Sequence, residues 1–257
     1  MIALCLVAVS TVMVPAQGFD WEYSARMPMY ASPSYIGLSA SASDDGHSTD
    51  MKVLDQAREG FPEIVCTSFE RGSGSSLRFQ FAGEYWRSSV VSLNLRAGYA
   101  HRTSMFTGNS PRALLFDGSY LQSSYELSTN VHALNVEPAV KVCFPNSHVW
   151  GSLGVRAEFF VGSQSRLMER IVEPSGFVFP GTTSRERSLA DRDLAGLRRF
   201  VVNPVVMAGI DVSAGRDMYV SPAVVIALPF MSYGDRAVWT SVSFGAQLSF
   251  FCAVRGD

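Results

Sequence analysis

The stretch from Leu134 to Val161, LNVEPAVKVCFPNSHVWGSLGVRAEFFV, decides the fold of this chain. Apolar residues occupy every second position up to Phe144, and the alternation resumes at Val149 after Pro145-Asn146-Ser147. Successive side chains of a β-strand point to opposite faces, so both strands of this hairpin have one apolar face and one face that carries charge. A tilted strand needs about ten residues to cross a bilayer, and these strands are long enough. The pattern predicts a membrane-spanning β-hairpin.

Six further segments repeat this alternation and are predicted to be strands, at residues 34–42, 77–86, 91–100, 203–212, 218–230 and 238–251. Long connections at residues 43–75, 102–133 and 162–199 alternate with short ones. Outer-membrane barrels have tight periplasmic turns and long outer loops, and the sheet must close because lipid cannot pair an open edge. We therefore expect an all-β fold: an eight-stranded antiparallel transmembrane β-barrel with three long extracellular loops and short periplasmic turns.

The two ends of the chain are expected to lie outside the barrel, which spans residues 34–251. Residues 1–16 are apolar and end in small residues that suit a signal peptidase, which predicts a signal peptide cleaved near Ala16 and export to the outer membrane. A buried N-terminal strand is the alternative for this segment. Residues 17–33 would form a periplasmic lead-in, and residues 252–257 a short tail.

Composition excludes several classes of protein. After the signal, the chain has no run of about eighteen apolar residues, so a spanning helix is not expected. A formal charge of -2 gives no reason to expect a nucleic-acid partner. Cys66, Cys143 and Cys252 have no paired spacing, so neither a zinc site nor a disulfide framework is implied. We expect no cofactor and no metal.

Charged residues of the strands fall on the face opposite the apolar one. They are Arg78, Glu84, Arg96, Glu137, Lys141, Arg156, Glu158 and Asp211. Eight strands leave an interior only wide enough for side chains, so we expect these groups to form a buried, ion-paired network inside the barrel. A narrow gated pore is the alternative.

Aromatic residues and prolines of the strands lead to two more predictions. Outward aromatics should form a periplasmic girdle of Tyr85, Phe144 and Phe250 and an outer girdle of Tyr99, Phe159 and Phe230. A proline lacks the amide that a closed sheet needs, so bulges or strand ends are expected at Pro138, Pro204 and Pro222.

Several short motifs carry a resemblance to a known family. They are Asp20-Trp21-Glu22, Cys66-Thr67-Ser68-Phe69-Glu70-Arg71-Gly72-Ser73-Gly74, Val136-Glu137-Pro138, Asn203-Pro204 and Ser221-Pro222. With them, nearly the whole mature chain resembles the bacterial outer-membrane barrels of the OmpA/OmpX-like and PorT-like group, especially those of Bacteroidota and Chlorobi. In many such relatives a peptidoglycan-binding domain follows the barrel. This chain stops at Asp257, so the resemblance does not extend cell-wall anchoring to it.

The histidines and serines give little support for an enzyme. Barrel enzymes that modify lipid A use a His and a Ser near the outer rim, and His101 and Ser104 lie near the outer end of the third strand. Such a pair occurs by chance in a Ser-rich chain, and no triad or metal spacing is present in the sequence. We expect a non-enzymatic barrel with a structural role or an interaction role carried by its loops. A small passive pore is the first alternative, and a lipid A-modifying enzyme the second.

The third long loop, residues 162–199, is expected to carry the interaction. We expect Arg185, Arg187, Arg198 and Arg199 to contact lipopolysaccharide phosphates of the outer leaflet or an acidic partner. Ser188 followed by Asp191 indicates a helix start, which predicts a short helix at residues 189–199. The alternative is a solvated loop whose acidic residues cancel the charge. Other expected partners are outer-membrane lipids, the barrel-assembly machinery during insertion and an unidentified protein bound by the extracellular loops.

Overall fold

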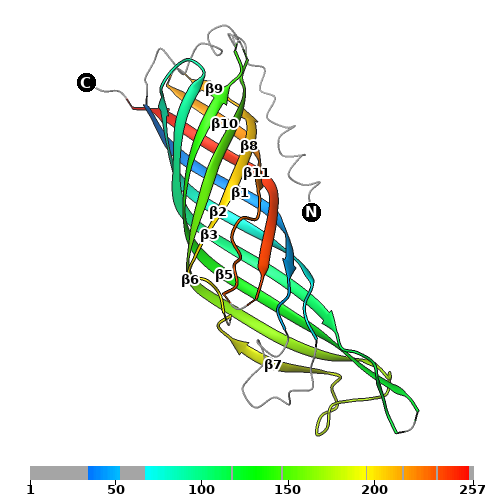
Figure 1. The fold of residues 1–257 in the computed structure, drawn as a ribbon. Coiled ribbons are helices and arrows are strands. Elements are labelled where there is room, and N and C mark those ends of the chain that lie inside the picture. The colour runs from blue at the N-terminus through cyan, green and yellow to red at the C-terminus, as the bar shows by residue number, and fades with distance from the viewer. Residues whose placement is uncertain are drawn as a thin grey trace.

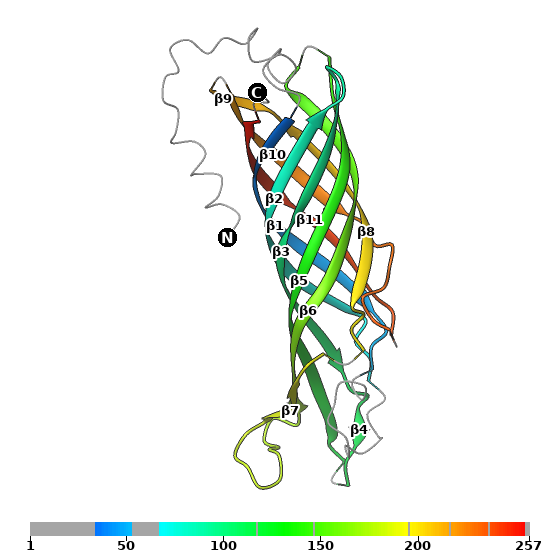
Figure 2. The same cartoon turned by 90° about the vertical axis from the view of Figure 1, so that its left-hand side faces the viewer.

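The computed structural model describes residues 34–52, 67–116, 118–145, 147–194, 196–215, 217–235 and 237–254. The predicted signal peptide and lead-in, and also Cys66, lie outside these residues. The strands, labelled in Figure 1 and Figure 2, are β1 (Ser34–Thr49), β2 (Arg71–Trp86), β3 (Val91–Asn109), β4 (Ala113–Leu114), β5 (Tyr120–Cys143), β6 (Val149–Glu173), β7 (Glu186–Arg192), β8 (Phe200–Ile210), β9 (Val212–Gly215), β10 (Met218–Ala227) and β11 (Trp239–Ala253). Within the described part of the chain, no helix is long and apolar enough to cross a membrane.

Eight of these strands form one closed antiparallel sheet, which confirms the predicted fold class. Around the barrel the order is β1, β2, β3, β5, β6, β8, β10 and β11, and β11 pairs again with β1 from Tyr35–Ala253 to Thr49–Trp239. The short strands are additions: β4 pairs with β5, β7 pairs with β6, and β9 continues the line of β8 against β10. β11 ends at Ala253, two residues beyond the predicted end of the barrel at residue 251.

The strands are much longer than predicted on the extracellular side. β5 has 24 residues and β6 has 25, so residues 120–133 and 162–173, which were predicted to be loop, are in fact strand. The reason is that polar and apolar residues continue to alternate, but here the apolar residues point inward and the polar residues point outward. Along β5, Leu127 and Val131 point inward and are buried, whereas Glu126 and Asn130 point outward and are exposed. Beyond the lipid the barrel buries apolar residues and shows polar residues to water.

The outward face carries an apolar band around the part of the barrel nearer the periplasm. Large side chains such as Leu38, Phe81 and Leu153 are 59%, 75% and 64% exposed there. Soluble proteins seldom leave so extended an apolar surface open to water, so the band must face lipid. The six predicted girdle aromatics are all exposed, and Tyr99, Leu134, Phe159 and Phe200 are consecutive cross-strand neighbours along the upper part of the band.

The three strand prolines interrupt hydrogen-bonded ladders. The β5–β6 ladder stops at Ala139–Gly154 and resumes at Val136–Ala157 in the same register, on either side of Pro138. Pro222 follows the end of the β8–β10 ladder at Ala223–Gly209, and Pro204 lies just beyond its other end at Val205–Ala227. The prediction of strand ends is wrong, because all three prolines lie inside β5, β8 and β10, and only the ladder to one neighbouring strand is interrupted or ends there. The prediction of bulges is wrong, because the register shifts lie elsewhere, for example at His132/Ala133.

An arginine placed in the middle of the apolar band should destabilise the barrel. Val140, Leu153 and Val224 are exposed on the outward face at this depth. We expect Val140→Arg, Leu153→Arg and Val224→Arg each to lower the free energy of unfolding by about 2–4 kcal/mol in vesicles, measured by urea titration. Asn130→Arg is the matched control, because Asn130 also points outward from β5 but lies on the extracellular side of the apolar band. Equal stability of Val140→Arg and Asn130→Arg would show that the band is misplaced.

Candidate functional site

A carboxylate at the centre of the barrel organises the buried charges. Glu137 on β5 accepts hydrogen bonds from Arg96 Nη1 at 3.1 Å and from Arg156 Nε at 2.7 Å. All three side chains are at most 3% exposed. One carboxylate between two guanidinium groups carries net positive charge, so further acids are needed nearby.

Glu158 supplies the second carboxylate, two residues after Arg156 on the inward face of β6. It lies 3.9 Å from Arg78 and 3.4 Å from Arg102, and Arg102 Nε forms a second ion pair with Asp45 at 3.2 Å. The sequence analysis missed Arg102 and Asp45, because it assigned them to loops. Their inward positions follow once the alternation of β1 and β3 is continued past residues 42 and 100, which is the signal that would have found them.

Lys141 forms a separate group nearer the periplasmic end. Its Nζ lies 3.2 Å from Glu84 of β2 and 2.6 Å from Asp211, which lies between β8 and β9, so one lysine bridges two acids that are far apart in the sequence. The rings of Trp86, Trp150 and Tyr219 surround the same ammonium group, with centroids 5.3, 4.9 and 5.4 Å away. Aromatic faces stabilise a desolvated cation by cation–π attraction, so this cage offsets part of the cost of burying the charge.

All eight residues predicted to line the interior are buried, and the structure divides them between these two groups. The central group holds Arg78, Arg96, Glu137, Arg156 and Glu158, and the periplasmic group holds Glu84, Lys141 and Asp211.

An apolar cluster fills the barrel on the extracellular side of the charged layer. Its buried members are Met51, Phe69, Phe106, Tyr125, Leu127, Val131, Leu167, Leu189, Ala190, Leu194, Val201, Tyr233 and Trp239. Because they come from strands and connections all around the barrel, they cover the extracellular side of the ion network. Buried side chains therefore occupy both the charged layer and the layer on its extracellular side, as expected for eight strands.

The histidine and serine that touch each other inside the barrel are not arranged for nucleophilic catalysis. His101 and Ser104 lie on opposite faces of β3, and Ser104 instead contacts His47, with 2.9 Å between Oγ and Nε2. The indole N–H of Trp239 donates to His47 Nδ1 at 3.2 Å, so the ring proton lies on Nε2 and points at the serine. A protonated Nε2 cannot accept the hydroxyl proton of Ser104. No group of three or more metal-binding side chains occurs among the described residues.

The four arginines proposed to bind phosphate are not brought together. Arg185 donates to the carbonyl groups of Ile171 and Val172, and Arg187 pairs with Glu169 at 2.7 Å. The Arg199 carbonyl accepts from the amide of Phe160, nine residues below Glu169 on the same strand, which corresponds to roughly 30 Å. The predicted helix at residues 189–199 is wrong, because β7 (Glu186–Arg192) pairs with the exposed edge of β6 and this pairing overrides the local capping signal.

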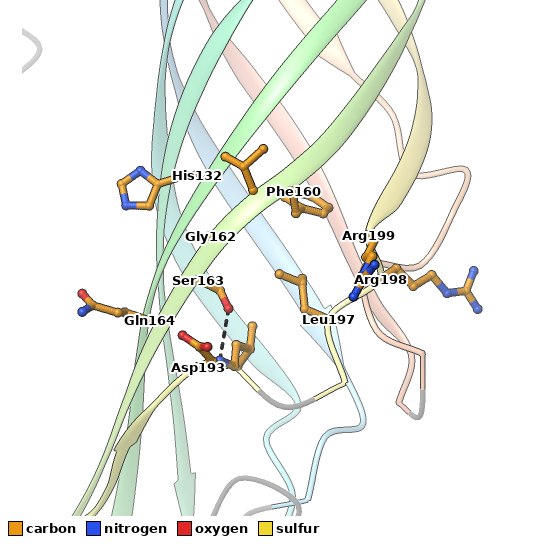
Figure 3. Close-up of a pocket in the computed structure, with 11 residues that line it drawn as sticks. His132, Phe160, Gly162, Ser163, Gln164, Asp193, Leu197, Arg198 and Arg199 are labelled. Atoms are coloured by element: carbon orange, nitrogen blue, oxygen red, sulfur yellow. Dashed lines mark hydrogen bonds between the residues drawn. The ribbon is translucent and has the colours of Figure 1, made fainter.

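Arg198 and Arg199 instead line an open groove at the outer edge of the membrane band (Figure 3). The groove has a volume of about 710 Å³. It exists because β6 changes partner, from β8 up to Phe159–Phe200 to β7 from Ser165–Arg192 onward, which leaves the intervening residues of β6 without a neighbouring strand on that side. The lining residues are His132, Phe160, Val161, Gly162, Ser163, Gln164, Asp193, Leu194, Leu197, Arg198 and Arg199.

Removal of the central carboxylate should reveal the coupling in the ion network. Glu137→Ala leaves Arg96 and Arg156 without their shared acid, so we expect a loss of about 3–5 kcal/mol in unfolding free energy. The double change with Arg156→Ala should cost less than the sum of the single changes, with a coupling of about 1–3 kcal/mol in urea unfolding. The control is the pair Arg170–Glu186, whose side chains are 67% and 54% exposed and whose coupling should stay below about 0.5 kcal/mol. Equal coupling in both pairs would contradict a buried network.

Comparisons with known proteins find likeness only among solved structures. No protein-family model matches the chain, and no curated protein matches it. The outer membrane protein OprG from Pseudomonas aeruginosa is 10% identical with a TM-score of 0.37, covering 87% of this chain and 97% of that one. Neisserial surface protein A is 10% identical with a TM-score of 0.31, covering 85% and 96%. Ail, the attachment invasion locus protein of Yersinia pestis, is 9% identical with a TM-score of 0.26, covering 84% and 98%.

Structural similarities with TM-scores this low do not indicate a function. The assignment of this chain as a membrane β-barrel therefore rests on its own structure. The narrower Bacteroidota or Chlorobi type stays a prediction. A closed antiparallel sheet with an apolar exterior is a structure that can satisfy its whole backbone in lipid, and this chain accordingly has the fold of a transmembrane β-barrel.

Proposed function

We propose that the chain is a non-enzymatic, non-conducting barrel that acts by binding through its extracellular part. The observation that carries this proposal is the filled interior. Glu137 and Phe106 are both fully buried, one in the charged layer and the other in the apolar cluster above it. A water-filled channel would leave such side chains exposed to solvent, and here two successive layers block the path.

The extracellular part is built as a stiff projection. We use the term projecting hairpin for residues 120–132 of β5 and 162–173 of β6, together with β4 and β7. Figure 2 shows it extending well past the rest of the barrel. From Leu134 to Tyr120 the strand covers fourteen residues, roughly 35 Å along the barrel axis at an ordinary strand tilt. Paired strands hold such a surface in one conformation, which lowers the entropic cost of binding.

Ion pairs and exposed aromatic residues support a binding role for this hairpin. Arg187–Glu169 and Arg112–Glu173, at 2.7 and 3.2 Å, tie its strands and loops together. Near its tip, Leu114, Phe116 and Tyr120 are 68%, 114% and 51% exposed. Exposed aromatic side chains are enriched where proteins bind partners. The partners we propose are outer-membrane lipids at the base of the projection and a protein contacted by its distal part, after insertion by the barrel-assembly machinery.

Conductance separates this proposal from the pore alternative. Refolded protein in planar bilayers should produce no steady, reproducible channels, because the ion network and the apolar cluster block the lumen. A channel-forming porin in the same membranes serves as the positive control. Reproducible single-channel steps that scale with protein concentration would overturn the non-conducting assignment.

The enzyme alternative is tested on lipid A in cells. Overexpression should leave the mass spectrum of lipid A unchanged, because His47 holds its proton toward Ser104 and cannot act as a base. The matched strain expresses Ser104→Ala at the same level. A new lipid A species that appears with the natural chain and disappears with Ser104→Ala would show that the protein is an enzyme.

A further inference from the structure

The groove beside β6 lies at the level of lipid headgroups. Phe159 and Phe200 form the last pair between β6 and β8, with ring centroids 4.7 Å apart, and both point out of the barrel in the apolar band. Phe160 and Arg199 are the next residues along their strands and already line the groove. Strands rise about 3.3 Å per residue, so the groove begins within a few ångströms of the edge of the band. In a bilayer this is the headgroup region of the outer leaflet.

Two arginine side chains face this region, and they differ in their ion pairing. Arg198 Nε donates to Asp235 at 3.0 Å, so part of its charge is neutralised. The side chain of Arg199 is exposed and has no hydrogen-bond or ion-pair partner among the residues that the structure describes. A guanidinium presents a planar fork of donors that matches phosphate oxygens. Arg199 is therefore the residue best placed to meet an anion, with Arg198 beside it.

The opposite side of the groove carries one imidazole, that of His132. His132 is the first outward residue of β5 above Leu134, and Tyr99 holds it by a hydrogen bond to Nδ1. The ring of His101 stacks on the same imidazole at 4.9 Å. This contact fixes the His132 ring and leaves Nε2 as its remaining polar atom. Figure 3 shows His132 and the arginines on opposite sides of the β6 segment that crosses the groove.

From this arrangement we propose that the groove binds a phosphate group of an outer-leaflet lipid, with Arg199 and Arg198 as its charged ligands. The inference rests on the proposed function, because it requires the apolar band to lie in the outer membrane. The acyl chains of the lipid pack on Phe159 and Phe200, directly below the arginines. Asp193 also lines the groove and opposes the binding of an anion, so it sets an upper limit on affinity.

Lipid binding by the refolded full chain tests this site. The probes are lipid A with both phosphates and the same lipid after enzymatic dephosphorylation, each titrated into micelles and counted per barrel by native mass spectrometry. We expect the phosphorylated lipid to bind more tightly, and Arg199→Ala to weaken its binding roughly tenfold, the loss of one charge-assisted contact. Asp193→Asn should strengthen binding.

Arg166→Ala is the matched control, because Arg166 is an exposed, outward arginine of β6 that does not line the groove. The affinity of Arg166→Ala for the phosphorylated lipid should equal that of the natural chain. Equal effects of Arg199→Ala and Arg166→Ala, or equal binding of dephosphorylated lipid, would overturn the site. Full competition by inorganic phosphate at lipid-like concentrations would also overturn the assignment to a lipid. A barrel that folds and does not conduct, yet shows no phosphate preference, contradicts this inference alone. A chain that fails to insert into vesicles contradicts the proposed function instead.

Discussion

The pairing of β1 with β11 is the contact on which the rest of the structure depends. It joins the first and last strands over fifteen residue pairs and removes both edges of the sheet. In lipid an unpaired strand edge would expose amide and carbonyl groups that nothing can satisfy. Closure also separates an inside from an outside, so the two faces of every strand meet different media. The apolar band, the buried charges and the position of the groove all follow from that separation.

Charge in the interior is arranged by height along the barrel axis. Lys141 with its two acids lies toward the periplasm, and Glu137, Glu158 and Asp45 lie in the middle with four arginines. Removal of one partner is costly because it leaves a buried charge unpaired, whereas a complete network is tolerated. Such networks link strands that are far apart in sequence. They therefore specify which strand faces which across the lumen, in addition to the ladder hydrogen bonds.

The membrane-facing part of the fold could be predicted from the sequence, because lipid demands an apolar residue at every second position. The eight strands and the inward set from Arg78 to Asp211 were found by this rule. The extracellular continuation could not be found, because residues such as Leu127 and Asn130 reverse the sense of the pattern beyond the lipid. Arg102 and Asp45 were missed for the same reason. The groove depends on β6 changing partner from β8 to β7, which is a property of strand pairing and not of local sequence.

The irregularity at His132/Ala133 has a consequence for how this protein can change during evolution. Val161 is the unpaired residue there, and beyond it the inward positions of β6 change from even to odd numbers, as in Glu158 and Leu167. One additional residue thus decides that Leu167 and Ile171 are buried and that Arg166 and Arg170 face solvent. Insertion or loss of a single residue within this strand would exchange these sets, whereas a change of two would preserve them. Unless a further bulge forms, as at Gln122/Ser123, the projecting hairpin therefore keeps its buried face only when its strands change in length by two residues.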